Sequence, residues 1–140
     1  MRPGSLGKVR APGASWTSRA EVNNHTRHRV LGQAVDAATQ SILGESRSPF
    51  RKVGEPVSRG RHHWFARYWA NALATQNIDV ELAAHFEPIA KALADGEDAI
   101  LAELAEVQGM AADLGGYYRT NADQTAAVMR PSATLNAIID

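Results

Sequence analysis

The sequence predicts a mainly α-helical protein, and three observations support this fold class. Apolar residues recur with the 3.6-residue period of an amphipathic helix along most of the chain. No stretch alternates apolar and polar residues as a half-buried strand would. Glycine and proline separate the periodic stretches, as expected for the turns between helices. The expected helices cover residues 27–43, 63–76, 79–94, 97–108, 122–129 and 132–139.

Residues 1–24 are expected to form a disordered basic tail, followed by a helical segment over 25–140. The tail shows neither the period of a helix nor that of a strand. Its Arg-rich, acid-poor composition is that of a transit peptide, but its glycines and prolines would interrupt the amphipathic helix that such a peptide forms. The interrupting residues are Pro3, Gly4, Gly7, Pro12 and Gly13.

The first expected helix, residues 27–43, carries one apolar stripe. Val30, Ala34 and Ala38 recur every four residues, so they lie on one face of a helix. Gly44 follows directly, at the position where a glycine commonly ends a helix. The sequence therefore predicts an amphipathic helix that stops at this glycine.

Residues 44–61 lack helical periodicity, because prolines and glycines recur through them. Clustered guanidinium groups in a glycine-bearing loop suit phosphate, since the planar fork of arginine matches two phosphate oxygens. A solvated basic loop would have the same composition, so both interpretations stay open at this point. The basic side chains are Arg47, Arg51, Lys52, Arg59 and Arg61.

The most apolar segment, residues 62–76, is expected to be the central core helix. Phe65 and Trp69 share one helical face, and further aromatic residues lie beside them. This spacing favours a packed core over a platform for stacking bases or a cofactor. The adjacent His62 and His63 cannot share a helix face, so they are a poor pair of metal ligands.

Two further helices are expected at 79–94 and 97–108. Pro88 predicts a kink or a fresh start in the first of them. Asp95 is expected to cap the second, and Gly109 to close it. Three carboxylates fall at positions that we expect to face solvent, and their spacing does not predict a metal site: Glu97, Glu103 and Glu106.

The last stretch predicts a loop and two short helices. Gly115 and Gly116 give the backbone access to positive φ. Pro131 prevents one continuous helix, and Ser132 directly after it is a ready N-cap for the final run.

Composition excludes several classes of protein. The chain has no cysteine, which excludes disulfide scaffolds and thiolate metal sites and fits a reducing compartment. No apolar run approaches the ~20 residues that span a membrane. Residues 1–70 are basic and residues 71–140 acidic, although the net charge is zero. This asymmetry predicts either an anion site at one end or two halves that attract each other, or a chain that is part of something larger.

Three motifs carry a resemblance to one enzyme family. They are SPFRKVGE at 48–55, Arg59-Gly60 and His62 followed by YWANALA at 68–74, and Gly-Tyr-Tyr at 116–118 followed by RPSAT at 130–134. In this order and spacing they resemble the C-terminal end of the monomeric-type NADP-dependent isocitrate dehydrogenases.

The resemblance covers about residues 27–140, whereas residues 1–22 show no likeness to the family. Pro56-Val57-Ser58 stand where the family usually has Leu-Asp-Asn. The loop thus lacks an acidic and an amide side chain, and the helix after it is repacked. The other departures are Arg61, His63, Trp64 and Arg67.

The resemblance implies the helical C-terminal segment of the large domain of such an enzyme. Family members oxidise and decarboxylate isocitrate to 2-oxoglutarate, forming NADPH, in the tricarboxylic acid cycle and at the glyoxylate bypass. They use Mg or Mn, and no residue of this chain corresponds to the metal ligands or to a catalytic group. The isolated chain is therefore expected to be inactive.

The resemblance also assigns one cofactor contact and the partners. In the family, the arginine of the Arg-Lys-Val-Gly-Glu motif lies near the 2′-phosphate of NADP, and here that arginine is Arg51. Isocitrate, NADP and a complementing N-terminal part are the expected partners, in the cytoplasm, with no nucleic acid and no membrane. The alternative is a catalytically inactive helical remnant that acts as an interaction module.

Overall fold

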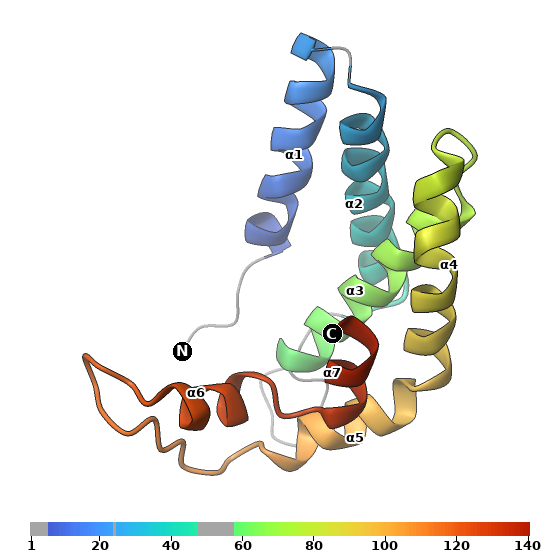
Figure 1. Ribbon diagram of the computed structural model, residues 1–140. Coiled ribbons are helices and arrows are strands. Elements are labelled where there is room, and N and C mark those ends of the chain that lie inside the picture. Colours follow the sequence, from blue (N-terminus) through green and yellow to red (C-terminus); the bar gives the residue numbers. More distant parts are fainter. Residues whose placement is uncertain (1–5, 24, 48–57) are drawn as a thin grey trace.

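The computed structural model describes residues 6–23, 25–47 and 58–140. Within these residues it contains seven α-helices and no β-strand, so the mainly α fold class is confirmed (Figure 1). The helices are α1 (Leu6–Asn23), α2 (Thr26–Gly44), α3 (Ser58–Thr75), α4 (Val80–Asp95), α5 (Glu97–Glu106), α6 (Ala122–Met129) and α7 (Ala133–Ile139).

The longer helices pack side by side in chain order, α1 on α2, α2 on α3 and α3 on α4. The chain then turns, and α5 and α7 pack together across the lower end of α3 and α4 (Figure 1). A long loop and α6 extend away from this body at the lower left of the same view. Helix α3 is central, because α2, α4 and α5 all contact it.

The structure corrects the expected disordered tail, since residues 6–23 form α1. Two glycines explain why α1 packs although its apolar periodicity is poor. A Cβ on Gly13 would lie 2.6 Å from Cγ1 of Val35, and one on Gly32 would lie 2.4 Å from Oγ1 of Thr17. The missing side chains let α1 and α2 approach closely. Gly13, one of the residues that suggested disorder in the sequence, therefore permits tight helix packing.

Two hydrophobic clusters form much of the core among the described helices, and α3 contributes to both. The first joins Val30 and Ala34 of α2 to Leu73 of α3. The second lies between α3, α4 and α5 and consists of Ala70, Leu93, Ile100 and Leu104, with Leu135 and Ile138 of α7 packed against it. The interpretation of residues 62–76 as a central core helix is confirmed.

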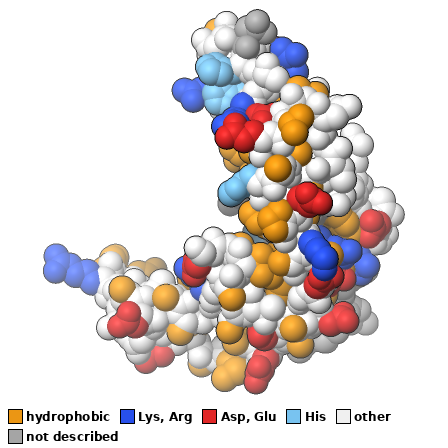
Figure 2. All heavy atoms as spheres, turned by 45° about the vertical axis from the view of Figure 1, so that its right-hand side comes forward, with side chains coloured by type: hydrophobic (Ala, Val, Ile, Leu, Met, Phe, Trp, Pro, Cys, Tyr) orange, Lys and Arg blue, Asp and Glu red, His pale blue; other side chains and the backbone are white. Residues whose placement is uncertain are grey.

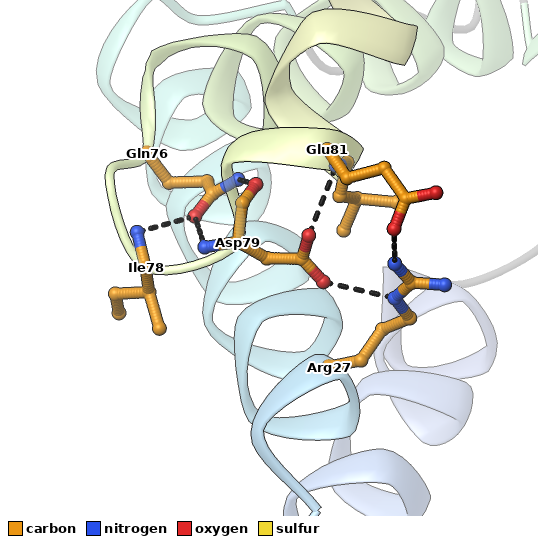
Figure 3. Close-up of polar contacts among 6 residues, drawn as sticks. Arg27, Gln76, Ile78, Asp79 and Glu81 are labelled. Carbon is orange, nitrogen blue, oxygen red and sulfur yellow. Dashed lines mark hydrogen bonds and ion pairs between the residues drawn. The ribbon is translucent and has the colours of Figure 1, made fainter.

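Arg27 at the start of α2 holds the turn between α3 and α4 (Figure 3). Its guanidinium donates to Asp79 at 2.8 Å and to Glu81 at 2.9 Å. Asp79 in turn caps α4, because its other carboxylate oxygen accepts from Leu82 N at 3.0 Å. The turn is closed by Gln76, whose amide oxygen accepts from Asp79 N at 2.8 Å. Arg27 comes from the basic half and both acids from the acidic half, so the two halves attract each other here.

Two local features differ from those expected. Helix α4 is continuous through the exposed Pro88, so no new helix starts there. Asp95 does not cap α5 but ends α4, where it pairs with Lys91 at 2.6 Å, and Gly96 is the N-cap of α5. Helix α2 ends at Gly44 as expected, and Ser46, two residues later, takes the left-handed conformation with φ 54°.

Other local predictions are confirmed. Gly109 follows α5 with φ 73°, and Gly115 takes φ 72° in the loop before α6. Ser132 caps α7, because its hydroxyl accepts from Leu135 N at 3.0 Å. These positions depend on local backbone chemistry, which the sequence expresses directly.

Candidate functional site

The candidate site is the basic region at the junction of α2 and α3. Arg51, the residue to which the resemblance assigns the cofactor contact, lies outside the described residues, as do the rest of residues 48–57. Both flanks of this segment are described. The end of α2 precedes it and the first turn of α3 follows it, and each flank carries arginines with defined contacts.

The flank before the segment is held against α3 by an aromatic residue. The guanidinium carbon of Arg47 lies 4.0 Å from the ring centroid of Trp64, a cation–π contact on a nearly buried indole. The hydroxyl of Tyr68, one turn further along α3, donates a hydrogen bond to the carboxylate of Glu45. Burial, and next the bond to Glu45, raise the pKa of Tyr68 above its usual value. The phenol therefore stays protonated and keeps donating this bond.

The flank after the segment is tied to α6. Arg59, in the first turn of α3, donates a hydrogen bond to the carbonyl oxygen of Val128 at 3.2 Å. Arg61 is half-buried, and one of its terminal nitrogens is enclosed without a hydrogen-bond partner. A buried guanidinium nitrogen that makes no bond is unfavourable, so a ligand or an adjoining chain that accepted from it would be stabilised. The region thus holds an unused donor next to Arg59.

Deeper in α3, His63 is fully buried beside a charged pair. Arg67 donates to the carboxylate of Glu97 on α5, and His63 Nε2 lies 3.8 Å from the same oxygen, Oε2. Neither ring nitrogen of His63 makes a hydrogen bond in the structure. Burial is the main reason that its pKa lies below the usual value. The expectation that Glu97 faces solvent is therefore wrong, because α5 packs against α3 and brings this carboxylate onto Arg67.

Glu103 also departs from the expected solvent-facing position. It accepts hydrogen bonds from Ser132 Oγ at 2.6 Å, from Thr134 Oγ1 at 2.9 Å and from Thr134 N at 3.2 Å. These donors lower the pKa of Glu103. Ser132 and Thr134 belong to the RPSAT motif, so this motif fastens α7 to α5. The third carboxylate, Glu106, is exposed as expected.

The described part of the chain does not gather metal ligands. Nowhere in residues 6–23, 25–47 and 58–140 do three His, Asp or Glu side chains lie together as a metal ion would require. Among the described helices none is both long and apolar enough to cross a membrane. What the described region offers chemically is cationic and aromatic side chains around the junction of α2 and α3, which suit an anionic ligand.

The family model for monomeric isocitrate dehydrogenase matches residues 1–140. The chain belongs to this family. Isocitrate dehydrogenase [NADP] of Corynebacterium glutamicum is 45% identical over all 140 residues, and its counterpart in Azotobacter vinelandii is 46% identical over 139 residues. Isocitrate dehydrogenase [NADP] 2 of Mycobacterium tuberculosis is 44% identical over 140 residues. The chain spans 19% of the length of each of these relatives.

The match to the monomeric isocitrate dehydrogenase family is wider than the motifs suggested. It begins at residue 1, so residues 1–22 have family counterparts after all. This agrees with the packing of α1 on α2, which makes the first helix part of the same body. Helix α1 therefore packs with the helices that follow it.

Sequence reasoning missed the contacts that hold the flanks of the basic segment in this family member. Trp64 was assigned to the core, and no pattern connected it to Arg47. Glu45 and Tyr68 are 23 residues apart, and Arg59 and Val128 are 69 apart. The one available signal was the basic composition around 44–61, which predicted an anion site but not the residues that position it.

Proposed function

We propose that the chain is the C-terminal helical portion of an NADP-dependent isocitrate dehydrogenase. In the complete enzyme this portion takes part in oxidising isocitrate to 2-oxoglutarate with formation of NADPH, a reaction of the tricarboxylic acid cycle and of the glyoxylate bypass branch point. The observation that carries the proposal is identity of 44–46% along the whole chain to relatives named isocitrate dehydrogenase [NADP].

The contribution of this portion is part of the site for the 2′-phosphate of NADP, through Arg51. Support comes from the two flanks, which are anchored on α3 and α6 through Arg47 and Arg59. The described arginines of both flanks, like Arg51 itself, carry guanidinium groups that suit an anionic ligand. A phosphate monoester offers two oxygens to a guanidinium fork, and NAD has no phosphate at that position.

The chemistry itself belongs to the remainder of the enzyme. Mg or Mn would supply electrophilic stabilisation of negative charge when bound, and the residues that would hold it and the catalytic groups lie on the complementing part. No residue of this chain is given a catalytic role. A cytoplasmic location accompanies the proposal, because a cysteine-free chain suits a reducing compartment.

Fragment complementation tests the proposal. The Corynebacterium glutamicum relative is produced with the stretch that matches this chain deleted, and the 140-residue chain is added in excess. We expect NADPH formation from isocitrate and Mg or Mn only when both pieces are present. Activity of the chain by itself, or no activity in the mixture although the two pieces bind, would contradict the proposed role.

An inactive interaction module is the second candidate, and the exposed apolar side chains favour it. Val22, Leu43, Met110 and Ile139 are each more than half exposed, and this apolar surface could bind another protein without a cofactor. This candidate predicts that the chain binds the deleted enzyme but restores no NADPH formation. Strong binding of an apolar dye is expected from either candidate.

A further inference from the structure

The loop and helix between α5 and α7, residues 107–130, form a projecting arm. Figure 1 shows the arm reaching away from the body of packed helices. Figure 2 shows it extending to the left beside a hollow on that face of the molecule. Helix α6, the helical part of the arm, has no backbone packing on another described helix and buries none of its residues, and Arg59 of α3 reaches it through one hydrogen bond to Val128 O at 3.2 Å.

The arm nevertheless has a defined conformation, which hydrogen bonds between its own residues stabilise. Gly115 has φ 72°, and a Cβ there would lie 2.3 Å from the Gln124 side chain. The carboxylate of Asp113 accepts from Gly115 N at 2.9 Å and from Gln124 Nε2 at 3.0 Å. Asn121 caps α6 through Asp123 N and Gln124 N, and its own N donates to Leu114 O at 2.7 Å. These bonds close the loop on itself, and the bond from Arg59 to Val128 O links the arm to the body.

The arm presents its largest side chains to solvent. Tyr117 and Tyr118 are 89% and 94% exposed, and their rings meet edge to face with centroids 4.9 Å apart. Met110 and Met129 are 70% and 72% exposed on the same arm. An eight-residue helix that buries none of its residues is marginal in water, and the burial of two exposed aromatic rings is favourable. The arm therefore has the properties of one half of an interface.

We propose that the arm docks into an apolar pocket on the remainder of an isocitrate dehydrogenase of this family, with Tyr117 and Tyr118 as the anchors. This inference rests on the proposed function. The remainder of the enzyme is the expected binding partner of the arm, because about four-fifths of each relative lies outside the stretch that this chain matches. Tyrosine is enriched among residues that dominate binding energy, since it adds a large rigid surface at small loss of entropy.

Binding to the deleted Corynebacterium glutamicum enzyme tests the arm. The double variant Tyr117→Ser, Tyr118→Ser should weaken the dissociation constant about 10- to 100-fold, as loss of two anchors does. The control is Ile78→Ser, Val80→Ser, which removes two exposed apolar side chains from the turn between α3 and α4. The control should bind within about threefold of the unchanged chain. Circular dichroism of both variants reports whether the helices are retained.

Hydrogen exchange gives a second measurement on the unchanged chain. Amides of α6 should exchange quickly in the free chain and slow at least about tenfold on adding the deleted enzyme, because docking stabilises a helix that is marginal alone. If the pieces bind and restore NADPH formation but neither the tyrosine variant nor α6 exchange responds, the arm inference is overturned while the proposed function survives. If the unchanged chain does not bind at all, both are overturned. Loss of self-association in the tyrosine variant, without binding to the deleted enzyme, would assign the arm to a second copy and overturn the inference.

Discussion

Ser132 joins α7 to α5 through Glu103. The serine hydroxyl donates to the carboxylate at 2.6 Å and at the same time accepts from Leu135 N at 3.0 Å. One buried side chain therefore both starts a helix and fastens it to its neighbour. The two residues are 29 positions apart, and their pairing explains why serine follows proline in the RPSAT motif of this chain.

Replacing Ser132 with Ala should lower the free energy of unfolding by about 2 kcal/mol, the upper part of the range for loss of an N-cap. Asn121→Ala is the control, because Asn121 caps α6 in the same way but joins it to no other helix. Urea denaturation followed by circular dichroism measures both. We expect Asn121→Ala to lower the free energy of unfolding by less than half as much as Ser132→Ala. Equal decreases would show that the bond to Glu103 does not stabilise the fold.

The Ser132→Ala effect should also depend on pH. Hydrogen bonds hold the pKa of Glu103 below its ordinary value of 4.5, so the ionised carboxylate favours the folded state. Its contribution is complete above pH 4.5 and is lost as pH falls through the lower pKa of the folded state. The difference in stability between the unchanged chain and Ser132→Ala should therefore narrow in acid. A difference that is constant from pH 7 to pH 3 would contradict this.

His63 should make the chain less stable in mild acid. Burial lowers its pKa below the ordinary 6.5, so below pH 6.5 the unfolded chain binds a proton that the folded chain does not. Stability therefore falls as pH falls from 6.5 towards the folded pKa. His63→Phe should flatten this dependence between pH 7 and pH 5, since it removes the buried titrating ring. His85→Gln, at an exposed position on α4, is the control variant.

Arg51 should determine the preference for NADP over NAD. The test places residues 48–61 of this chain in the Corynebacterium glutamicum relative and then replaces Arg51 with Ala. The Michaelis constant for NADP should rise by about one order of magnitude or more, as expected for losing a charged hydrogen bond of about 1.5–3 kcal/mol. The Michaelis constant for NAD should change little. Equal increases in the Michaelis constants for NADP and NAD would show that Arg51 only supports the loop.

Gly32 should be essential for the packing of α1. A side chain there meets Thr17 Oγ1 at 2.4 Å and the Gly13 carbonyl oxygen at 3.1 Å, so Gly32→Val should push α1 away from α2 at a cost of about 1–3 kcal/mol. Limited proteolysis should then cut within residues 6–23 much faster. Gly44→Ala is the matched control, because a Cβ at Gly44 meets no atom within 4 Å. Equal protease resistance of both variants would contradict close packing of the two helices.

The sequence by itself determined the features that depend on neighbouring residues. Periodic apolar residues placed helices α2 to α7 to within a few residues, except at the start of α3, which begins five residues earlier than the expected 63. Ser132 was identified as a cap because a cap bonds an amide three residues away in its own chain. Gly109 and Gly115 were assigned to turns because positive φ favours glycine whatever packs around it.

Only the tertiary structure decided features whose partners lie far along the chain. Glu97 and Glu103 were expected to face solvent, but α3 and the start of α7 bring Arg67 and Ser132 to them. Gly13 suggested disorder in the sequence. A sequence alone does not distinguish a glycine that leaves room for a neighbouring helix from a glycine that interrupts the helix in which it lies. Helical periodicity says which face is apolar but not which helix will cover it, and that choice sets the environment of every polar side chain at the contact.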